Sequence, residues 1–126
     1  MPSAATQEPI ATFDFERLNV YQLALRFLDR IFDLADRLPS RTQSSLGDQL
    51  RRAALSISNN IAEGNDKRSK KERCQYFARA SDSARECISM FNVLKMRELI
   101  EPAEWTELRS TGRQITSMIR GLMDSA

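Results

Sequence analysis

The feature that most restricts the fold of this chain is an apolar repeat with heptad-like spacing in four successive segments. In the first segment, about residues 16–38, apolar side chains recur at intervals of three and four: Tyr21, Ala24, Leu28, Ile31, Ala35 and Leu38. This spacing places them on one face of an α-helix. The same spacing recurs over about residues 45–63, over 69–98, and from 102 onward. The sequence therefore predicts four helices, each with one buried face.

Short polar segments separate the four predicted helices. Ser40–Ser45 are predicted to form a polar turn, and Gly64 to close the second helix in a left-handed conformation. Ser69 and Glu72 form a capping box that starts the third helix, and Pro102 stands in the first turn of the fourth. Because all three connections are short, we expect an all-α, up-down-up-down antiparallel four-helix bundle.

The N-terminal residues differ from the rest of the chain. Residues 1–14 are small and polar with two prolines, and we expect a mobile N-terminal tail. Residues 15–126 are then a single four-helix-bundle domain, as the length of 126 residues suggests. No window approaches eighteen consecutive apolar residues, and the N-terminus does not resemble a signal peptide. We therefore expect a cytoplasmic protein that does not cross a membrane.

The chain contains no histidine, which excludes several kinds of active site. Ser-His-Asp and Cys-His nucleophile systems, His-ligated zinc and the Glu-x-x-His di-iron site all require this residue. Cys74 and Cys87 are thirteen residues apart on one predicted helix, or about 20 Å, so they cannot form a disulfide with each other. We expect no catalytic residues, no metal and no cofactor.

A polar stripe accompanies the core stripe on each of the two central predicted helices. Ser56, Asn60 and Glu63 share one face of the second helix, and Ser83 and Glu86 share one face of the third. One interpretation is a small polar site in which Glu63 and Glu86 form a carboxylate pair. The other is a hydrogen-bond network, within the bundle or between subunits, that fixes helix register.

These residues resemble the signature of a known bacterial family. Gln49–Ala54, Ser56-Ile57 and the run Asn60-Ile61-Ala62-Glu63-Gly64 are similar to the 23S ribosomal-RNA intervening-sequence proteins. Leu18–Gln22 and the later Phe77, Ala80, Ser83 and Glu86 fit the same pattern, so the resemblance covers about residues 13–123. It implies a four-helix bundle that assembles into a homopentamer. Accessory proteins of diversity-generating retroelements have a similar fold, and they bind nucleic acid and a reverse transcriptase.

Two further patterns concern surfaces. Three apolar residues lie off the predicted core faces and are candidates for an oligomer interface: Leu55, Met90 and Val93. Basic residues gather in two clusters that could attract a phosphate backbone or could be solvated helix faces. One cluster lies at the second turn and consists of Lys67, Arg68, Lys70, Lys71 and Arg73. The other lies along the fourth helix and consists of Arg109, Arg113 and Arg120.

The net charge of only +2 does not itself indicate nucleic-acid binding. Phe77, Phe91 and Trp105 fall on predicted core faces, so base stacking is not predicted. The leading hypothesis is a non-enzymatic homo-oligomer that binds RNA or DNA non-specifically through the basic clusters. A protein-docking scaffold is the second hypothesis. An enzyme or metal site built on Glu63 and Glu86 is the third.

Overall fold

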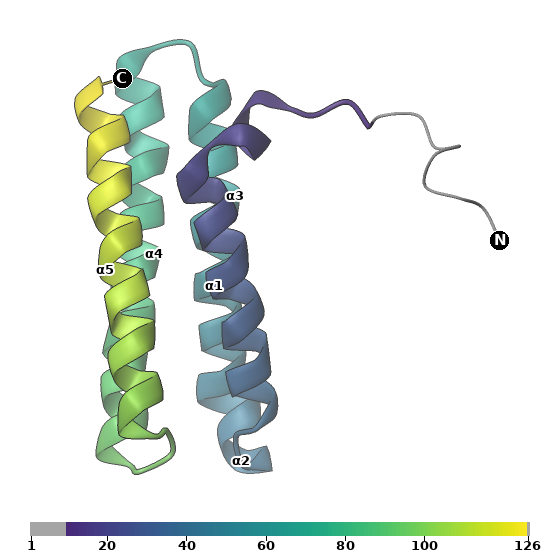
Figure 1. The fold of residues 1–126 in the computed structure, drawn as a ribbon, viewed down its shortest axis with the longest axis vertical. Coiled ribbons are helices and arrows are strands. Elements are labelled where there is room, and N and C mark those ends of the chain that lie inside the picture. The colour runs from purple at the N-terminus through teal and green to yellow at the C-terminus, as the bar shows by residue number, and fades with distance from the viewer. Residues whose placement is uncertain (1–9, 126) are drawn as a thin grey trace, which may run out of the picture.

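The computed structural model describes residues 10–125, and these fold into a bundle of helices (Figure 1). The four long helices are α1 (Asn19–Asp36), α3 (Asp48–Asp66), α4 (Lys70–Met96) and α5 (Pro102–Ser125). A 3-10 turn over Asp14–Arg17 precedes α1. No strand occurs in the described part of the chain. The predicted all-α four-helix bundle is confirmed.

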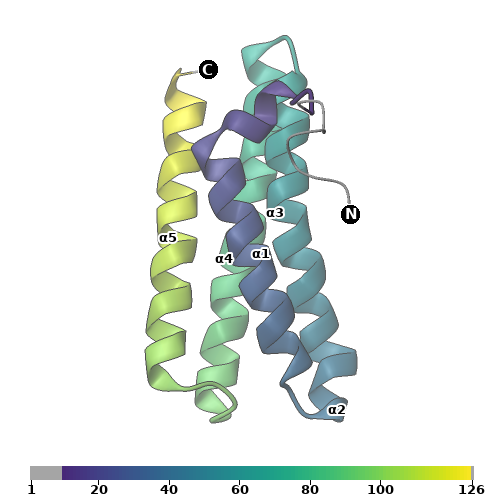
Figure 2. The ribbon, with the colours of Figure 1, turned by 45° about the vertical axis from the view of Figure 1, so that its right-hand side comes forward.

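Neighbouring helices run in opposite directions. The hydroxyl of Ser56 on α3 contacts that of Ser83 on α4, whereas Gly64, further along α3, lies against Phe77, earlier on α4. Residue numbers therefore rise along α3 as they fall along α4. The colour gradient in Figures 1 and 2 alternates in the same way from α1 through α5.

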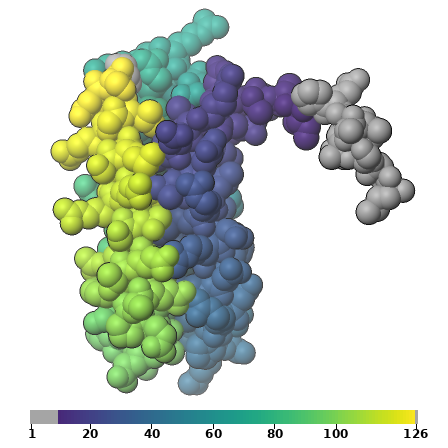
Figure 3. Space-filling view, viewed as in Figure 1, coloured from purple at the N-terminus to yellow at the C-terminus, as the bar shows by residue number. Residues whose placement is uncertain are grey.

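The four helices enclose one apolar core. Both α1 and α4 pack against α3 and α5, so α1 lies diagonally opposite α4. Across the centre of the bundle, the rings of Phe27 and Phe91 meet edge to face with their centroids 6.0 Å apart. On one outer face the atoms of α1 and α5 meet along the bundle (Figure 3), where Arg30 Nη1 lies 2.7 Å from Glu107 Oε1. The core is therefore closed on the α1–α5 side as well.

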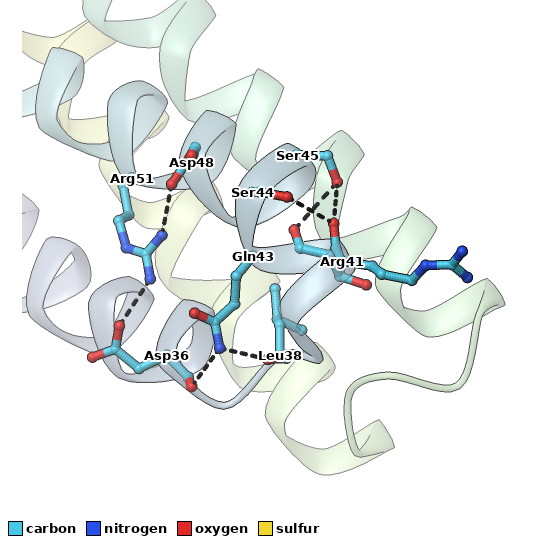
Figure 4. A network of polar contacts seen from close by, with 9 residues as sticks. Asp36, Leu38, Arg41, Gln43, Ser44, Ser45, Asp48 and Arg51 are labelled. Atoms are coloured by element: carbon cyan, nitrogen blue, oxygen red, sulfur yellow. Dashed lines mark hydrogen bonds and ion pairs between the residues drawn. The ribbon is translucent and has the colours of Figure 1, made fainter.

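The connection between α1 and α3 is helical, so the prediction of a polar turn over Ser40–Ser45 is wrong. The short helix α2 (Ser40–Thr42) continues through a π-helical turn, Gln43–Gly47, directly into α3. Figure 4 shows the polar contacts that hold this connection against the end of α1. The Gln43 side chain donates hydrogen bonds to the carbonyls of Asp36 and Leu38, at 3.1 and 2.7 Å, and so caps the end of α1. Arg51 then joins α3 to the Asp36 carboxylate at 2.8 Å.

Gly64 does not close the second helix. It lies inside α3, and none of the described glycines has a positive φ. A Cβ atom at this position would lie 2.7 Å from Cε1 of Phe77 and 3.0 Å from Cβ of Tyr76. Gly64 is therefore required because α4 packs closely there, and not because the backbone turns.

The helix starts that the sequence indicates are present. The Ser69 hydroxyl accepts a hydrogen bond from the Glu72 amide at 3.1 Å, which confirms the N-cap of α4, and Pro102 begins α5. At the other end of α4, Glu98 has a φ of 58°, and the Leu99 amide donates to the Leu94 carbonyl at 2.8 Å. This arrangement is a Schellman motif with glutamate at the left-handed position.

The predicted tail, residues 1–14, lies mainly outside the described residues. Its last residues include two exposed apolar side chains, Ile10 and Phe13. Each helix in the described range is too short or too polar to cross a bilayer.

Candidate nucleic-acid interface

The polar stripes of α3 and α4 meet and form a hydrogen-bond network. The Ser83 hydroxyl donates to the Ser56 hydroxyl at 2.9 Å. The Asn60 amide donates to the carbonyl and the hydroxyl of Ser56, at 2.8 and 2.9 Å. Ser83 is buried, while Ser56 and Asn60 are half-buried. The contacts support the structural interpretation, in which these groups join α3 to α4 within one chain.

The two glutamates of the stripes do not form a carboxylate pair. Because α3 and α4 are antiparallel, Glu63 lies about 10 Å to one side of the Ser56–Ser83 contact and Glu86 about 4 Å to the other. Both residues are exposed, and Glu63 instead lies 3.5 Å from the Lys67 ammonium group. The contacts therefore do not support an enzyme or metal site built on Glu63 and Glu86, since two carboxylates this far apart cannot act on one substrate atom or share one metal ion.

The candidate interface residues differ in exposure. Leu55 and Val93 are exposed, by 44% and 40%. The placement of Met90 outside the core is wrong, because Met90 belongs to the buried cluster. Met90 is buried because α4 packs against both α3 and α5, so the buried face of α4 is wider than one heptad stripe. Sequence reasoning also missed Leu25 and Phe32, which are exposed on α1 and seven residues apart.

The basic cluster at the turn between α3 and α4 divides into two groups. The Arg73 guanidinium donates to the carbonyls of Lys67 and Arg68, at 3.2 and 2.6 Å, and so holds the turn. Lys67 pairs with a glutamate and also lies 5.2 Å from the centre of a tyrosine ring. Arg68, Lys70 and Lys71 are exposed and have no ion-pair partner among the described residues. These three side chains are available to an external anion.

The second basic cluster lines a groove between α4 and α5. Near the C-terminal end of α5 the groove has a volume of about 690 Å³, and its wall includes Arg113 and Arg120. Arg113 also lines the adjoining section, of about 440 Å³, together with Arg109 and Trp105. Trp105 and Arg109 then border a third section of about 410 Å³. Consecutive sections share lining residues, so they adjoin one another along this face.

The charge of the groove is mainly positive. Arg85 and Lys95 of α4 face the three arginines of α5, and the acidic residues of the lining are Asp82 and Asp124. Sequence reasoning missed Arg85 and Lys95 because their relation to α5 depends on how the two helices pair. No periodic pattern along α4 alone indicates it.

Trp105 packs against the core, as its place on the predicted core face indicates, but the core does not enclose it completely. It is half-buried and lines two sections of the groove. The Lys95 ammonium lies 4.5 Å and the Arg109 guanidinium 4.7 Å from the centre of its ring. Its indole N–H donates to Asn92 Oδ1 at 3.1 Å, and Arg109 donates to the same oxygen at 2.9 Å. The groove therefore contains an aromatic side chain in a fixed position among cations.

The fold is similar to one already solved by crystallography. That structure is of a protein with unknown function from the S23 ribosomal protein family of Bacteroides thetaiotaomicron. The TM-score is 0.77 at 21% identity, and the match covers 83% of this chain and 95% of the other. No curated protein matches the chain. Residues 16–121 match the 23S rRNA-intervening sequence protein family, and the chain belongs to that family.

Proposed function

We propose that this protein is a non-enzymatic nucleic-acid-binding protein that holds a phosphate backbone in the groove between α4 and α5. One observation carries the proposal: five basic side chains from two helices, and only two acidic ones, line the three adjoining sections of the groove. Such an arrangement attracts phosphates irrespective of base sequence. The family name refers to intervening sequences of 23S rRNA, and RNA is therefore the first ligand to test.

The length of the groove suits several phosphates of one strand. Arg109 and Arg120 are eleven residues apart on α5, or about 16 Å along its axis. At that length several consecutive phosphates can contact arginines. The basic turn before α4 lies at the same end of the bundle as Arg120 and extends the positive surface (Figure 1).

A salt titration tests the proposal. We expect an unstructured RNA oligonucleotide to bind at low salt, with log K falling linearly against log salt concentration. The double variant Arg113→Gln/Arg120→Gln should reduce the magnitude of that slope by about 1.4, or 0.7 for each lost phosphate contact on a single strand. Arg26→Gln/Arg41→Gln is the matched control, because both arginines are exposed on α1 and α2 and the change in charge is equal.

Two results would overturn the proposal. One is the absence of binding at low salt. The other is a control variant that lowers the slope as much as the groove variant does, because binding would then depend on total charge and not on the groove.

A second proposal is that the protein assembles with itself through the outer face of α1 and α3. Leu25, Phe32 and Leu55 are each 40–44% exposed on these two helices, and α1 and α3 lie on the side of the bundle opposite the α4–α5 groove. The family resemblance implies a pentamer, and a ring of five subunits would need a second, different surface on each subunit besides this face.

The mass in solution tests this second proposal. Light scattering after size exclusion should give a multiple of 14.4 kDa for the unmodified chain, and Leu55→Glu should shift the distribution towards the monomer. A monomeric unmodified chain would refute it.

A further inference from the structure

We propose that Trp105 and the groove section around it form a stacking site for one unpaired base, so that the groove prefers single-stranded nucleic acid to a continuous duplex. This inference rests on the proposed function and adds the class of ligand. Its first support is position, because the ring of Trp105 lines the same groove as the basic side chains. A strand held by its phosphates would therefore pass within reach of the indole.

The second support is the chemistry of the section of about 410 Å³. Its lining consists of Asn92, Lys95, Met96, Trp105 and Arg109. The section is shallow and wide open to solvent, so it offers a face for a flat ligand and not an enclosing pocket. A base placed there could stack on the indole, since every base has an aromatic face. The Asn92 side-chain NH₂ donates to no acceptor in residues 10–125, and it remains available to a base edge.

The third support is the way in which the site is held. Asn92 Oδ1 accepts hydrogen bonds from both Trp105 and Arg109, and this fixes the indole plane before any ligand arrives. Lys95, by contrast, is exposed on a flexible four-carbon side chain, and a base can displace it from the ring. Met96 is 72% exposed at the edge of the section, and it offers an apolar contact for the other side of the base.

A duplex does not satisfy this arrangement. Its bases are stacked on one another, and their faces are unavailable to a side chain unless a base leaves the stack, which costs unstacking and unpairing energy. Phosphate contacts alone would then hold a duplex on the groove. The site should therefore bind single strands in preference to duplexes, and it should show little or no preference among the bases.

Trp105 is the single tryptophan of the chain, so its fluorescence reports on this site alone. We expect octamers of uridine and of 2′-deoxyuridine to quench the emission as they bind, and the octamer with the lower dissociation constant identifies the preferred sugar. An abasic octamer of equal charge should bind about 5- to 100-fold more weakly and leave the emission unchanged. A blunt duplex should also leave it unchanged.

Variants provide an independent readout by fluorescence polarisation of a labelled octamer. Trp105→Leu should lower affinity for the uridine octamer to that for the abasic one, and Trp105→Phe, which keeps an aromatic face, should retain most of it. Because Trp105 also packs against the core, thermal melts check that each variant is folded. Equal binding of uridine and abasic octamers, with unchanged Trp105 emission, would refute the stacking site and leave the phosphate groove intact. Absence of binding by either octamer would refute both.

Discussion

Replacing Gly64 with alanine tests the close packing of α3 on α4. In the interior of a helix, alanine is favoured over glycine by about 1 kcal/mol, so propensity alone would stabilise the variant. The new Cβ, however, would lie 2.7 and 2.8 Å from two ring carbons of Phe77. The ring is 2% exposed and cannot move away into solvent. Because overpacking of this kind costs about 1–3 kcal/mol, we expect a net loss of about 1 kcal/mol and a Tm lower by about 4 °C.

Gly121→Ala is the matched control. Gly121 lies on α5, is exposed, and a Cβ there would have nothing within 4 Å. Only the higher helix propensity of alanine then acts, so this variant should be more stable than the unmodified protein by about 0.5–1 kcal/mol. Urea unfolding of both variants, with equal m-values, would measure the difference. Equal stabilisation by the two alanines would refute the close approach of Phe77 to the family-motif glycine.

Three further changes test local interactions. Glu98→Gly should stabilise the protein by about 0.5–1 kcal/mol in urea unfolding, since glycine adopts the left-handed conformation of the α4 C-terminus without strain; a loss of stability would contradict that conformation. Burial raises the pKa of the Cys87 thiol from 9.0 to about 12. Below pH 9 the thiol is protonated in both states. Above pH 9 only the unfolded state loses the proton. The free energy of unfolding, relative to that of Cys87→Ala, should therefore fall by about 1.4 kcal/mol per pH unit up to about pH 12. A pH-independent difference between the two proteins would count against a buried thiol. Ser56→Ala removes the acceptor of Ser83 and Asn60 and should cost about 1–2 kcal/mol in thermal melts, whereas a neutral result would mean that the network contributes nothing.

Much of the fold follows from local sequence. Ser69 with Glu72 marks the start of α4, and Pro102 marks the start of α5, because a cap and a proline each act within one helical turn. The errors arise where tertiary contacts decide. In the sequence Gly64 is typical of a helix end, but in the structure it lies inside α3 and leaves space for the ring of Phe77. Met90 is buried because α4 packs against two helices.

The candidate site was predictable only in part. The arginines of α5 share one flank, and helical spacing is enough to show this. Arg85, Lys95 and Asn92 join them only because α4 and α5 are antiparallel in one particular register. That register follows from core packing, for example of Ile88 against Gly112, and not from the polar residues themselves. The environment of Trp105 depends on the same register.

Crosslinking is the most direct test of the claim that nucleic acid binds between α4 and α5. A 4-thiouridine oligonucleotide would be irradiated with the unmodified protein at low salt, and the crosslinked peptides would be identified by mass spectrometry. We expect crosslinks within residues 85–120, at Trp105 and neighbouring side chains of the groove, and we expect them to disappear as salt is raised. Crosslinks confined to α1 and α3, or crosslinks unaffected by salt, would contradict the claim.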